Sequence, residues 1–298
     1  MASLTITLAT LATQFLERPR LAPSTLRSYE QTLIPLLKEY GRWSVEILDR
    51  ELLSEYLNSL SHLKYTTHHR HQAILQSLFN FAVEKGYINS NPIARLKQRH
   101  PCREKGESLS DDIVHFLSPE QISLLYKLVA NDLRMNAIVH LLHRTGARIS
   151  ELLALNLEDV DLNHQKFQVL GKGNKRRWCF YSEDAANSLA EYIKYERFTP
   201  HPALFTARQP KTLIVSRISY QTVHKYWTEI TALSPELQNI RLHDLRHTFA
   251  TERVGLMGIE ELRALMGHTS IQTTLRYQKV TSARAEMVAR QALSCLVQ

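Results

Sequence analysis

Cysteine is scarce in this chain of 298 residues, and long apolar runs are absent. Its three cysteines, Cys102, Cys179 and Cys295, lie far apart, and neither their number nor their spacing fits a disulfide framework or a zinc site. No apolar run reaches the roughly 18 residues that a membrane-spanning helix needs. The first residues lack the basic leader and the cleavage site of a signal peptide. We therefore expect a cytoplasmic globular protein with reduced thiols and no membrane partner.

Acidic residues are too few to balance the basic ones. The chain has 37 lysines and arginines against 29 aspartates and glutamates, which gives a net charge of +8 and a pI of about 9.4. Two stretches concentrate the positive charge, residues 95–105 (RLKQRHPCREK) and residues 166–177 (KFQVLGKGNKRR), with five basic residues each. Either stretch alone is as typical of a solvated loop as of a binding surface. Together they favour a partner rich in phosphate groups, because basic side chains that bind phosphates release the counterions held there.

Helical periodicity dominates the first hundred residues. Apolar residues at helical spacing follow a candidate N-cap, Ser24, and stop at Gly41. The same plan repeats from a cap at Thr66 or Thr67 to a stop at Gly86. The sequence therefore predicts two long helices in this region.

A change of composition divides the chain. Residues 97–116 are polar and charged, and Ser118 followed by Pro119 then has the pattern of a new helix start. We predict a helical domain over residues 1–96, a basic and polar linker over residues 97–116, and a second domain over residues 117–298.

Only one segment has the pattern of β-structure. Residues 165–182 alternate in two runs around the turn GKGNK, which is typical of a hairpin. Further helices are predicted over residues 183–196, 220–232, 243–254, 259–266 and 282–296. The predicted fold is mainly α, with two helical domains and a small β-hairpin in the second.

The stretch TGARISELLAL, residues 145–155, places two opposite charges together. Arg148 follows Gly146 near a predicted helix start, and Glu151 lies three residues further on the same helix face. A carboxylate in this position can orient the guanidinium. The alternative is a surface ion pair without a functional role.

The stretch LHDLRHTFAT, residues 242–251, places His243 and Arg246 on one face of a predicted helix. His243 and His247 also have the spacing of a metal-binding pair, so a metallohydrolase is a rival interpretation. The zinc-protease pattern requires glutamate directly after the first histidine, where this chain has Asp244, and no third ligand is evident. We expect no metal and no other cofactor.

Further reactive residues complete a set suited to phosphodiester cleavage. Lys172 lies in the hairpin turn, and the stretch LMGHTSIQTTLRY carries His268 and Tyr277. Arg148 and Arg246 can hold the nonbridging oxygens and offset the charge of the transition state. The tyrosine hydroxyl can then attack phosphorus while a histidine accepts or guides its proton, and a lysine can protonate the departing sugar oxygen.

These residues resemble a known family. Arg148, Lys172, HDLRH, LMGH and Tyr277, in this order and at these spacings, look like the tyrosine site-specific recombinases, also called the phage-integrase family. The likeness covers nearly the whole chain, because STLRSYEQTL and HRHQAILQSLFNFAVEKGYINSNP resemble the core-binding domain of short Xer-type members. The resemblance implies that a helical core-binding domain and a mostly helical catalytic domain close as a clamp around double-stranded DNA.

The resemblance also implies a mechanism and an assembly. Strands are cut through a 3′-phosphotyrosyl intermediate, exchanged through a Holliday junction and rejoined, without a cofactor. The DNA carries paired inverted half-sites, and a homo-tetramer assembles on two sites, with a second recombinase or an accessory protein as an open requirement. The helix after Tyr277 packs on a neighbouring protomer, and the protein works at the nucleoid. By matched position the catalytic residues are Arg148, Lys172, His243, Arg246, His268 and Tyr277, with Glu151 behind them.

A further set of polar side chains is expected to contact DNA from both domains. These residues are Arg70, Gln72, Arg95, Lys97, Arg99, Lys175, Arg176, Gln221 and Lys225. Three alternatives stay open: a type IB topoisomerase, a non-catalytic DNA-binding regulator on the same scaffold, and the metallohydrolase. The sequence also leaves open whether the task is dimer resolution or movement of a mobile element.

Overall fold

The computed structural model describes residues 6–19, 21–102, 106–107, 114–171, 175–209, 211–278, 289, 290 and 293. Its internal contacts divide the chain into two compact units, Met1–Asp111 (unit 1) and Asp112–Gln298 (unit 2). Each unit has an apolar core of its own. Within the described residues, no helix is both long enough and apolar enough to cross a membrane.

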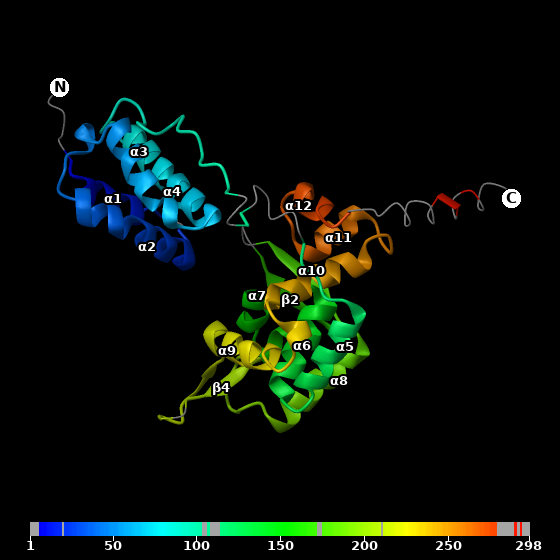
Figure 1. Cartoon of the computed structure of the whole chain (residues 1–298). Helices are drawn as coiled ribbons and strands as arrows, with labels where there is room; N and C mark the ends of the chain where they lie inside the picture. The colour runs from blue at the N-terminus through cyan, green and yellow to red at the C-terminus, as the bar shows by residue number, and fades with distance from the viewer. Residues whose placement is uncertain are drawn as a thin grey trace. The chain divides into compact units, whose positions relative to one another are not determined.

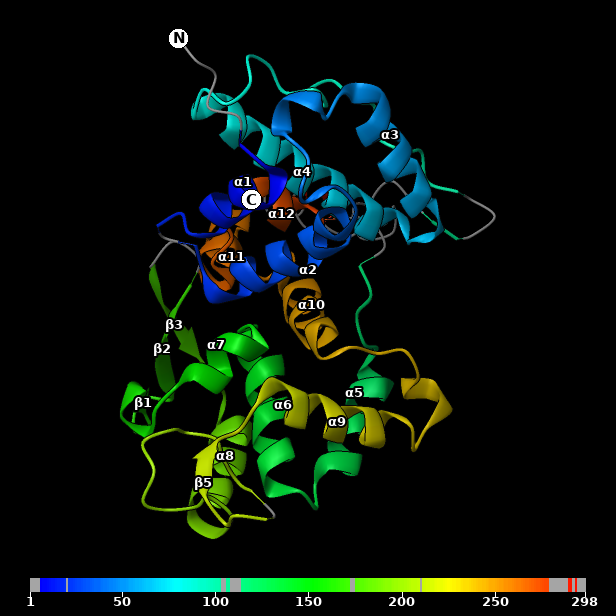
Figure 2. The ribbon, with the colours of Figure 1, turned by 90° about the vertical axis from the view of Figure 1, so that its left-hand side faces the viewer.

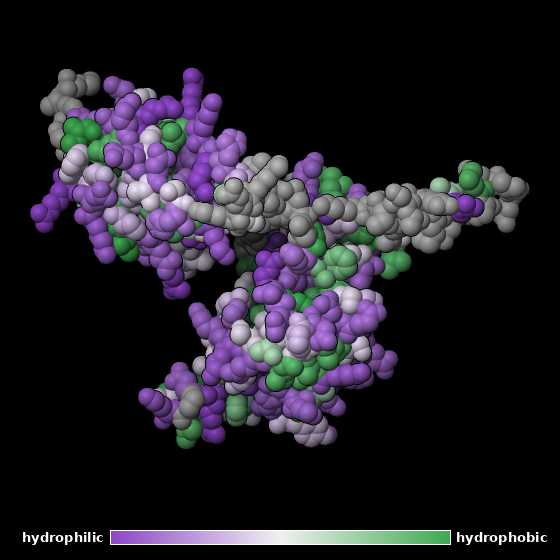
Figure 3. Space-filling view, viewed as in Figure 1, coloured by the Kyte–Doolittle hydropathy of each residue, from purple (hydrophilic) through white to green (hydrophobic). Residues whose placement is uncertain are grey.

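Unit 1 is helical throughout its described elements. It contains α1 (Leu8–Leu16), α2 (Pro23–Tyr40), η1 (Val45–Ile47), α3 (Arg50–Ser59), η2 (Leu60–His62) and α4 (Tyr65–Glu84). The α-helices are labelled in Figure 1. Its core includes Phe15, Leu36 and Phe79, whose side chains are fully buried. The face of unit 1 visible in Figure 3 is covered mainly by hydrophilic side chains. Each helix contributes apolar side chains to the core, and their burial is the main source of the unit's stability.

Both long helices of unit 1 end where the sequence predicts, but they begin elsewhere. Gly41 is the C-cap of α2, and Gly86 follows α4 with φ of +74°. The prediction that Ser24 caps α2 is wrong, because α2 begins at Pro23, and proline is favoured in the first turn where no N–H partner is needed. α4 begins at Tyr65, before the predicted threonines. The N–H of Tyr65 is satisfied instead by the Glu107 carboxylate at 2.8 Å, a partner 42 residues away that local spacing could not reveal.

The first part of the predicted linker is attached to unit 1. Arg99 forms an ion pair with Glu107 at 2.9 Å, and the other oxygen of Glu107 accepts the N–H of Cys102. By contrast, the N–H of Leu117 donates to the hydroxyl of Thr248 within unit 2 at 2.9 Å. The described residues between Lys97 and Glu107 are therefore folded against the helices that precede them.

Unit 2 holds the remaining described helices. They are α5 (Pro119–Val129), α6 (Leu133–Thr145), α7 (Ile149–Ala154), η4 (Leu157–Asp159), α8 (Glu183–Tyr195), α9 (Tyr220–Thr231), η5 (Pro235–Leu237), α10 (Leu242–Arg253), α11 (Ile259–Met266) and α12 (Ile271–Leu275). The predicted start of α5 is confirmed, since Ser118 and Gln121 form a capping box. The predicted helices at α8, α9, α10 and α11 are also confirmed. The helix predicted over residues 282–296 lies outside the described residues apart from isolated positions.

Two small antiparallel sheets lie in unit 2. The predicted hairpin is confirmed as β2 (Lys166–Leu170) and β3 (Arg176–Phe180), with β1 (Val160–Asp161) added at its edge. The prediction that this is the only β-structure is wrong, because β4 (Thr206–Arg208) pairs with β5 (Val215–Arg217). Strands of three residues are too short for an alternating pattern to be recognised. Figure 2 shows the hairpin beside α7, and α10 next to α6.

The turn after α6 depends on a glycine. Gly146 ends α6 with φ of +62°, a left-handed conformation that L side chains disfavour. A Cβ at this position would also lie 2.4 Å from the ring of Phe249 on α10. The backbone can therefore approach α10 closely here, and this approach sets the position of Arg148 two residues later.

We expect Gly146→Ala to lower the free energy of unfolding of unit 2 by about 3 kcal/mol, through left-handed strain of about 1–2 kcal/mol and overpacking of about 1–3 kcal/mol. The matched control is Gly86→Ala, because Gly86 has φ of +74° but no atom within 4 Å of an added Cβ. That change should cost about 1 kcal/mol in unit 1. Urea unfolding of both variants measures the difference, and equal losses would contradict the role of the Phe249 contact.

Candidate active site

The first part of the site is a carboxylate that orients an arginine. Arg148 is the N-cap of α7, and Glu151 accepts hydrogen bonds from both its backbone N–H and its guanidinium, each at 2.8 Å. The pairing expected from their spacing is therefore present. Glu151 is only 8% exposed, so the alternative of a surface ion pair does not apply to it. The side chain of Arg148 is about one-third exposed, which leaves it accessible to a ligand.

A second arginine, Arg177, also donates hydrogen bonds to Glu151, and the sequence analysis did not include it among the site residues. Arg177 on β3 donates to both oxygens of Glu151, at 3.0 and 2.7 Å, and its Nε donates to the carbonyl of Leu265 on α11. Burial alone would raise the pKa of Glu151, but the hydrogen bonds from Arg177 and from Arg148 outweigh it and lower the pKa to about 2. The strand pattern could have revealed this residue, because Arg177 shares the inward face of β3 with buried Cys179.

Arg246 on α10 lies deep in the unit and is 2% exposed. Its guanidinium donates to the carbonyl of Gly146 at the end of α6 and to the carbonyl of Met266 at the end of α11. Burial, together with the charges of Arg148 and Arg177, lowers the pKa of Arg246 to about 10. The side chain thus joins three segments that are far apart in the sequence.

Tyr277 lies in a small apolar core and not on the surface. It follows α12, its N–H donates to the carbonyl of Thr274, and it is 8% exposed among Phe249, Leu262 and Met266. The small polar residues around it in the sequence give no sign of this burial. Burial raises the pKa of Tyr277, while the charges of nearby arginines oppose that shift.

One histidine of the predicted set, His268, lies beside the tyrosine. The ring of His268 is nearly parallel to that of Tyr277, with centroids 6.3 Å apart, and its Nδ1 lies 2.9 Å from the hydroxyl of Thr274. Burial, followed by the charge of Arg246, lowers the pKa of His268 to about 3. Lys172 lies outside the described residues. The described chain before it ends at Gly171, where an added Cβ would lie 3.5 Å from the guanidinium of Arg177.

Positive charge exceeds negative charge around Tyr277. The buried carboxylate of Glu151 offsets only one of the three charges of Arg148, Arg177 and Arg246, so this site carries surplus positive charge. Cations that are partly removed from water lower each other's pKa and favour an anionic ligand. A phosphodiester has the charge and the oxygen geometry that guanidinium groups recognise.

The two histidines of the metal hypothesis do not form a metal site in this structure. The rings of His243 and His247 are at right angles with centroids 4.7 Å apart, and Nδ1 of His247 contacts the hydroxyl of Tyr277. Throughout the described part of the chain, no group of three or more His, Cys, Asp and Glu is arranged to hold a metal ion. The donor set therefore does not fit the metallohydrolase alternative.

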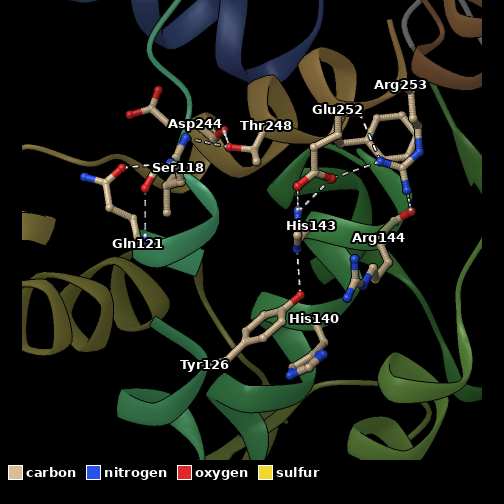
Figure 4. Close-up of polar contacts among 12 residues, drawn as sticks. Ser118, Gln121, Tyr126, His140, His143, Arg144, Asp244, Thr248, Glu252 and Arg253 are labelled. Atoms are coloured by element: carbon tan, nitrogen blue, oxygen red, sulfur yellow. Dashed lines mark hydrogen bonds and ion pairs between the residues drawn. The ribbon is translucent and has the colours of Figure 1, made fainter. Parts of the chain in front are cut away.

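A polar network behind the site fixes α10 against α6. His143 on α6 is 1% exposed, and its two ring nitrogens contact the hydroxyl of Tyr126 at 2.6 Å and the carboxylate of Glu252 at 3.0 Å (Figure 4). Arg253 donates to the carbonyl of Arg144. Arg148 follows α6 by three residues and Arg246 lies on α10. A network that fixes α6 against α10 therefore helps to set the relative position of the two arginines.

The side chains expected to contact DNA fall into three groups. Exposed residues are Arg70, Arg95, Lys97, Lys175, Arg176, Gln221 and Lys225. Arg99 is paired with Glu107. Gln72 is 2% exposed and donates to the carbonyl of Leu96, so it cannot reach a base, and we remove it from the expected set.

Part of this set lies at a basic cavity. Gln221 and Lys225 on α9 line a cavity of about 670 Å³ together with Arg134, Arg208 and Arg217. The cavity opens beside the first turn of α9, whose N-cap is Ser219. Cationic side chains at a helix N-terminus are suited to a phosphate backbone.

Known proteins are similar to this chain over most of its length. The profile of the phage integrase family matches residues 115–284. The chain is 30% identical to tyrosine recombinase XerC of Staphylococcus carnosus over 278 residues, which cover 89% of each protein. It is 29% identical to tyrosine recombinase XerC of Pediococcus pentosaceus over 257 residues, which cover 80% of each.

Solved structures share the fold. The Tn1549 transposon integrase in complex with transposon right end DNA matches with a TM-score of 0.77 at 17% identity, covering 97% of this chain and all of that one. XerH site-specific recombinase bound to palindromic difH substrate matches with a TM-score of 0.68 at 19% identity, covering 89% and 78%. The predicted fold class, mainly α with small sheets, is confirmed.

The family profile and the matched relatives define an enzyme that cleaves and rejoins DNA strands. The chain belongs to the phage integrase family, in which it is a tyrosine recombinase of the Xer type. The predicted family and enzyme class are confirmed, and the type IB topoisomerase alternative is not favoured.

Proposed function

We propose that this chain recombines DNA at specific sites and that Tyr277 is its nucleophile. The observation that carries the proposal is the buried Tyr277 side chain beside a cluster of arginines with surplus positive charge. Arg148 and Arg246 would hold the nonbridging oxygens of the scissile phosphate and stabilise the charge that develops in the transition state. Glu151 would orient Arg148 from behind.

The remaining catalytic roles follow from the chemistry of the step. Attack by the Tyr277 oxygen on phosphorus forms the 3′-phosphotyrosyl bond and releases the 5′-oxygen of the neighbouring nucleotide. Lys172 would protonate that oxygen, and His243 and His268 would assist at the phosphate. The bond energy kept in the phosphotyrosyl linkage allows rejoining without a nucleotide cofactor.

The proposed substrate is double-stranded DNA with paired inverted half-sites, one protomer to each half-site. Four protomers would assemble on two sites and pass through a Holliday junction, with unit 1 as core-binding domain, unit 2 as catalytic domain, and the segment after Tyr277 contacting a neighbouring protomer. We place this activity at the nucleoid, in dimer resolution or in integration and excision of a mobile element. Exposed side chains of both units would bind DNA: Arg70, Arg95, Lys97, Lys175, Arg176, Gln221 and Lys225.

Covalent capture tests this function. The wild-type chain is incubated with fragmented genomic DNA of its own organism, the mixture is denatured, and protein-linked DNA is recovered and sequenced. We expect a reproducible inverted repeat, and after nuclease digestion a nucleotide adduct on the peptide that contains Tyr277. Linkage should be unchanged in the presence of a chelator. An adduct on another residue, or no linkage, would contradict the proposal.

A further inference from the structure

The hydroxyl of Tyr277 is held by a histidine that the sequence did not place in the catalytic set. Nδ1 of His247 lies 2.8 Å from the hydroxyl oxygen, and the two ring centroids are 5.7 Å apart. His247 follows Arg246 on α10, so one of two adjacent residues contacts the tyrosine hydroxyl and the other is an arginine proposed to bind the phosphate. Water competes little for this hydrogen bond, because Tyr277 is buried.

The other two histidines near Tyr277 are oriented differently. His268 lies nearly parallel to the phenol ring, and its Nδ1 is engaged with the hydroxyl of Thr274. His243 packs edge-on against the ring of His247. Within the described residues, His247 is the side chain that makes a hydrogen bond to the Tyr277 hydroxyl.

The surroundings keep the His247 ring neutral at pH 7. Burial, and next the neighbouring His243, lower the pKa of His247 to about 4; Arg241 and Arg246 act in the same direction, and Asp244 opposes them. A neutral imidazole has one nitrogen without a proton, which can accept a hydrogen bond and then a proton. A phosphodiester bound at this site adds negative charge and so favours the protonated form of the His247 ring.

The tyrosine side of the pair is also surrounded by positive charge. Burial raises the pKa of Tyr277, while Arg246, Arg276 and Arg148 act to lower it. The phenol is therefore protonated at pH 7 and needs a proton acceptor when its oxygen attacks.

We propose that His247 is a further catalytic residue, which positions the Tyr277 hydroxyl and accepts its proton as the oxygen attacks phosphorus. This proposal rests on the proposed role of Tyr277 as the nucleophile. As the bond from the Tyr277 oxygen to phosphorus forms, the bond from phosphorus to the 5′-oxygen breaks. The phenol proton moves to Nδ1 of His247, and the 5′-oxygen takes a proton from a separate acid, proposed as Lys172. In rejoining, the imidazolium returns its proton to the tyrosine.

The free protein offers a direct test of the hydrogen bond. In protein labelled with ¹⁵N in its histidine rings, His247→Asn identifies the His247 signals at pH 7. We expect a neutral ring that carries its proton on Nε2 and whose Nδ1 signal moves in Tyr277→Phe. A ring protonated at Nδ1, or signals that Tyr277→Phe leaves unchanged, would overturn the proposal.

Kinetics test the proton transfer. The probe is a duplex with the inverted repeat recovered by covalent capture, and the measured quantity is the single-turnover rate of protein–DNA linkage. His247→Ala should link about 10²- to 10⁴-fold more slowly at pH 7, and its rate should rise with pH as the phenol ionises unaided. Added imidazole should restore part of the rate of His247→Ala. His247→Asn keeps a hydrogen-bonding group near the Nδ1 position but cannot accept a proton, so it should stay slow.

A modified duplex separates the two proton transfers. Sulfur in place of the bridging 5′-oxygen leaves as a thiolate without protonation, so this substrate should restore linkage by Lys172→Ala but not by His247→Ala. His164→Ala, at a largely exposed histidine of unit 2, is the matched control with an unchanged rate. A wild-type rate in His247→Ala, or its restoration by the thiolate substrate, would overturn this proposal alone. Absence of linkage by the wild-type chain would overturn the proposed function as well.

Discussion

The Tyr277→Phe variant is expected to form no covalent linkage with DNA under conditions in which the wild-type chain does. Phenylalanine lacks the attacking oxygen but has nearly the same shape, so it should fill the same apolar core beside Phe249 and Met266. Loss of the hydrogen bond to His247 should cost about 1 kcal/mol of stability. Since the arginines keep their carboxylate and carbonyl partners, DNA affinity should change by less than about twofold, which is below 0.5 kcal/mol.

Denaturing gels measure the linkage of Tyr277→Phe, and a binding titration at fixed salt measures its affinity. Tyr195→Phe, at an exposed position at the end of α8, is the matched control and should link DNA at the wild-type rate. Linkage that persists in Tyr277→Phe would identify a different nucleophile. Loss of binding together with linkage would show that Tyr277 is needed for the shape of the site and would contradict its assignment as nucleophile.

The Glu151→Gln variant should lose about 3 kcal/mol of stability at pH 7. The pKa of Glu151 is lowered from 4.5 to about 2 by hydrogen bonds that outweigh burial, and each pKa unit corresponds to about 1.4 kcal/mol. A lowered folded-state pKa means that the stabilisation is complete above pH 4.5 and is lost as the pH falls towards 2. A glutamine amide has only one acceptor oxygen, so it cannot accept hydrogen bonds from both Arg148 and Arg177 in place of the two carboxylate oxygens. It also removes the negative charge that offsets the charges of Arg148, Arg177 and Arg246.

Urea unfolding between pH 7 and pH 2 tests this prediction. In a Trp43→Phe background the remaining tryptophans, Trp178 and Trp227, both report on unit 2. The difference in stability between wild type and Glu151→Gln should shrink as the pH falls through this window. Glu191→Gln, at an exposed position on α8, is the control and should show no such difference. A pH-independent difference for Glu151→Gln would mean that packing and not charge stabilises this site.

Local spacing was sufficient to predict many elements of this fold. The capping box at Ser118 and the alternation around the hairpin turn are patterns within a few residues, and both are present in the structure. The Arg148–Glu151 pair was also predictable, because residues three apart on a helix are neighbours. Helix starts were less predictable, since the N–H of Tyr65, the first residue of α4, donates to a carboxylate 42 residues away.

The sequence by itself determined the family, the enzyme class and the identity of a candidate nucleophile, because these depend on ordered motifs and residue types. Only the tertiary structure decided which groups meet. Arg246 reaches the carbonyl of Gly146 across 100 residues, and His247 reaches Tyr277 across 30. Burial of Gln72 and of Tyr277 likewise depends on which helix faces pack together. Such contacts are set by the burial of apolar surface between elements, and this information is absent from the spacing within any one of them.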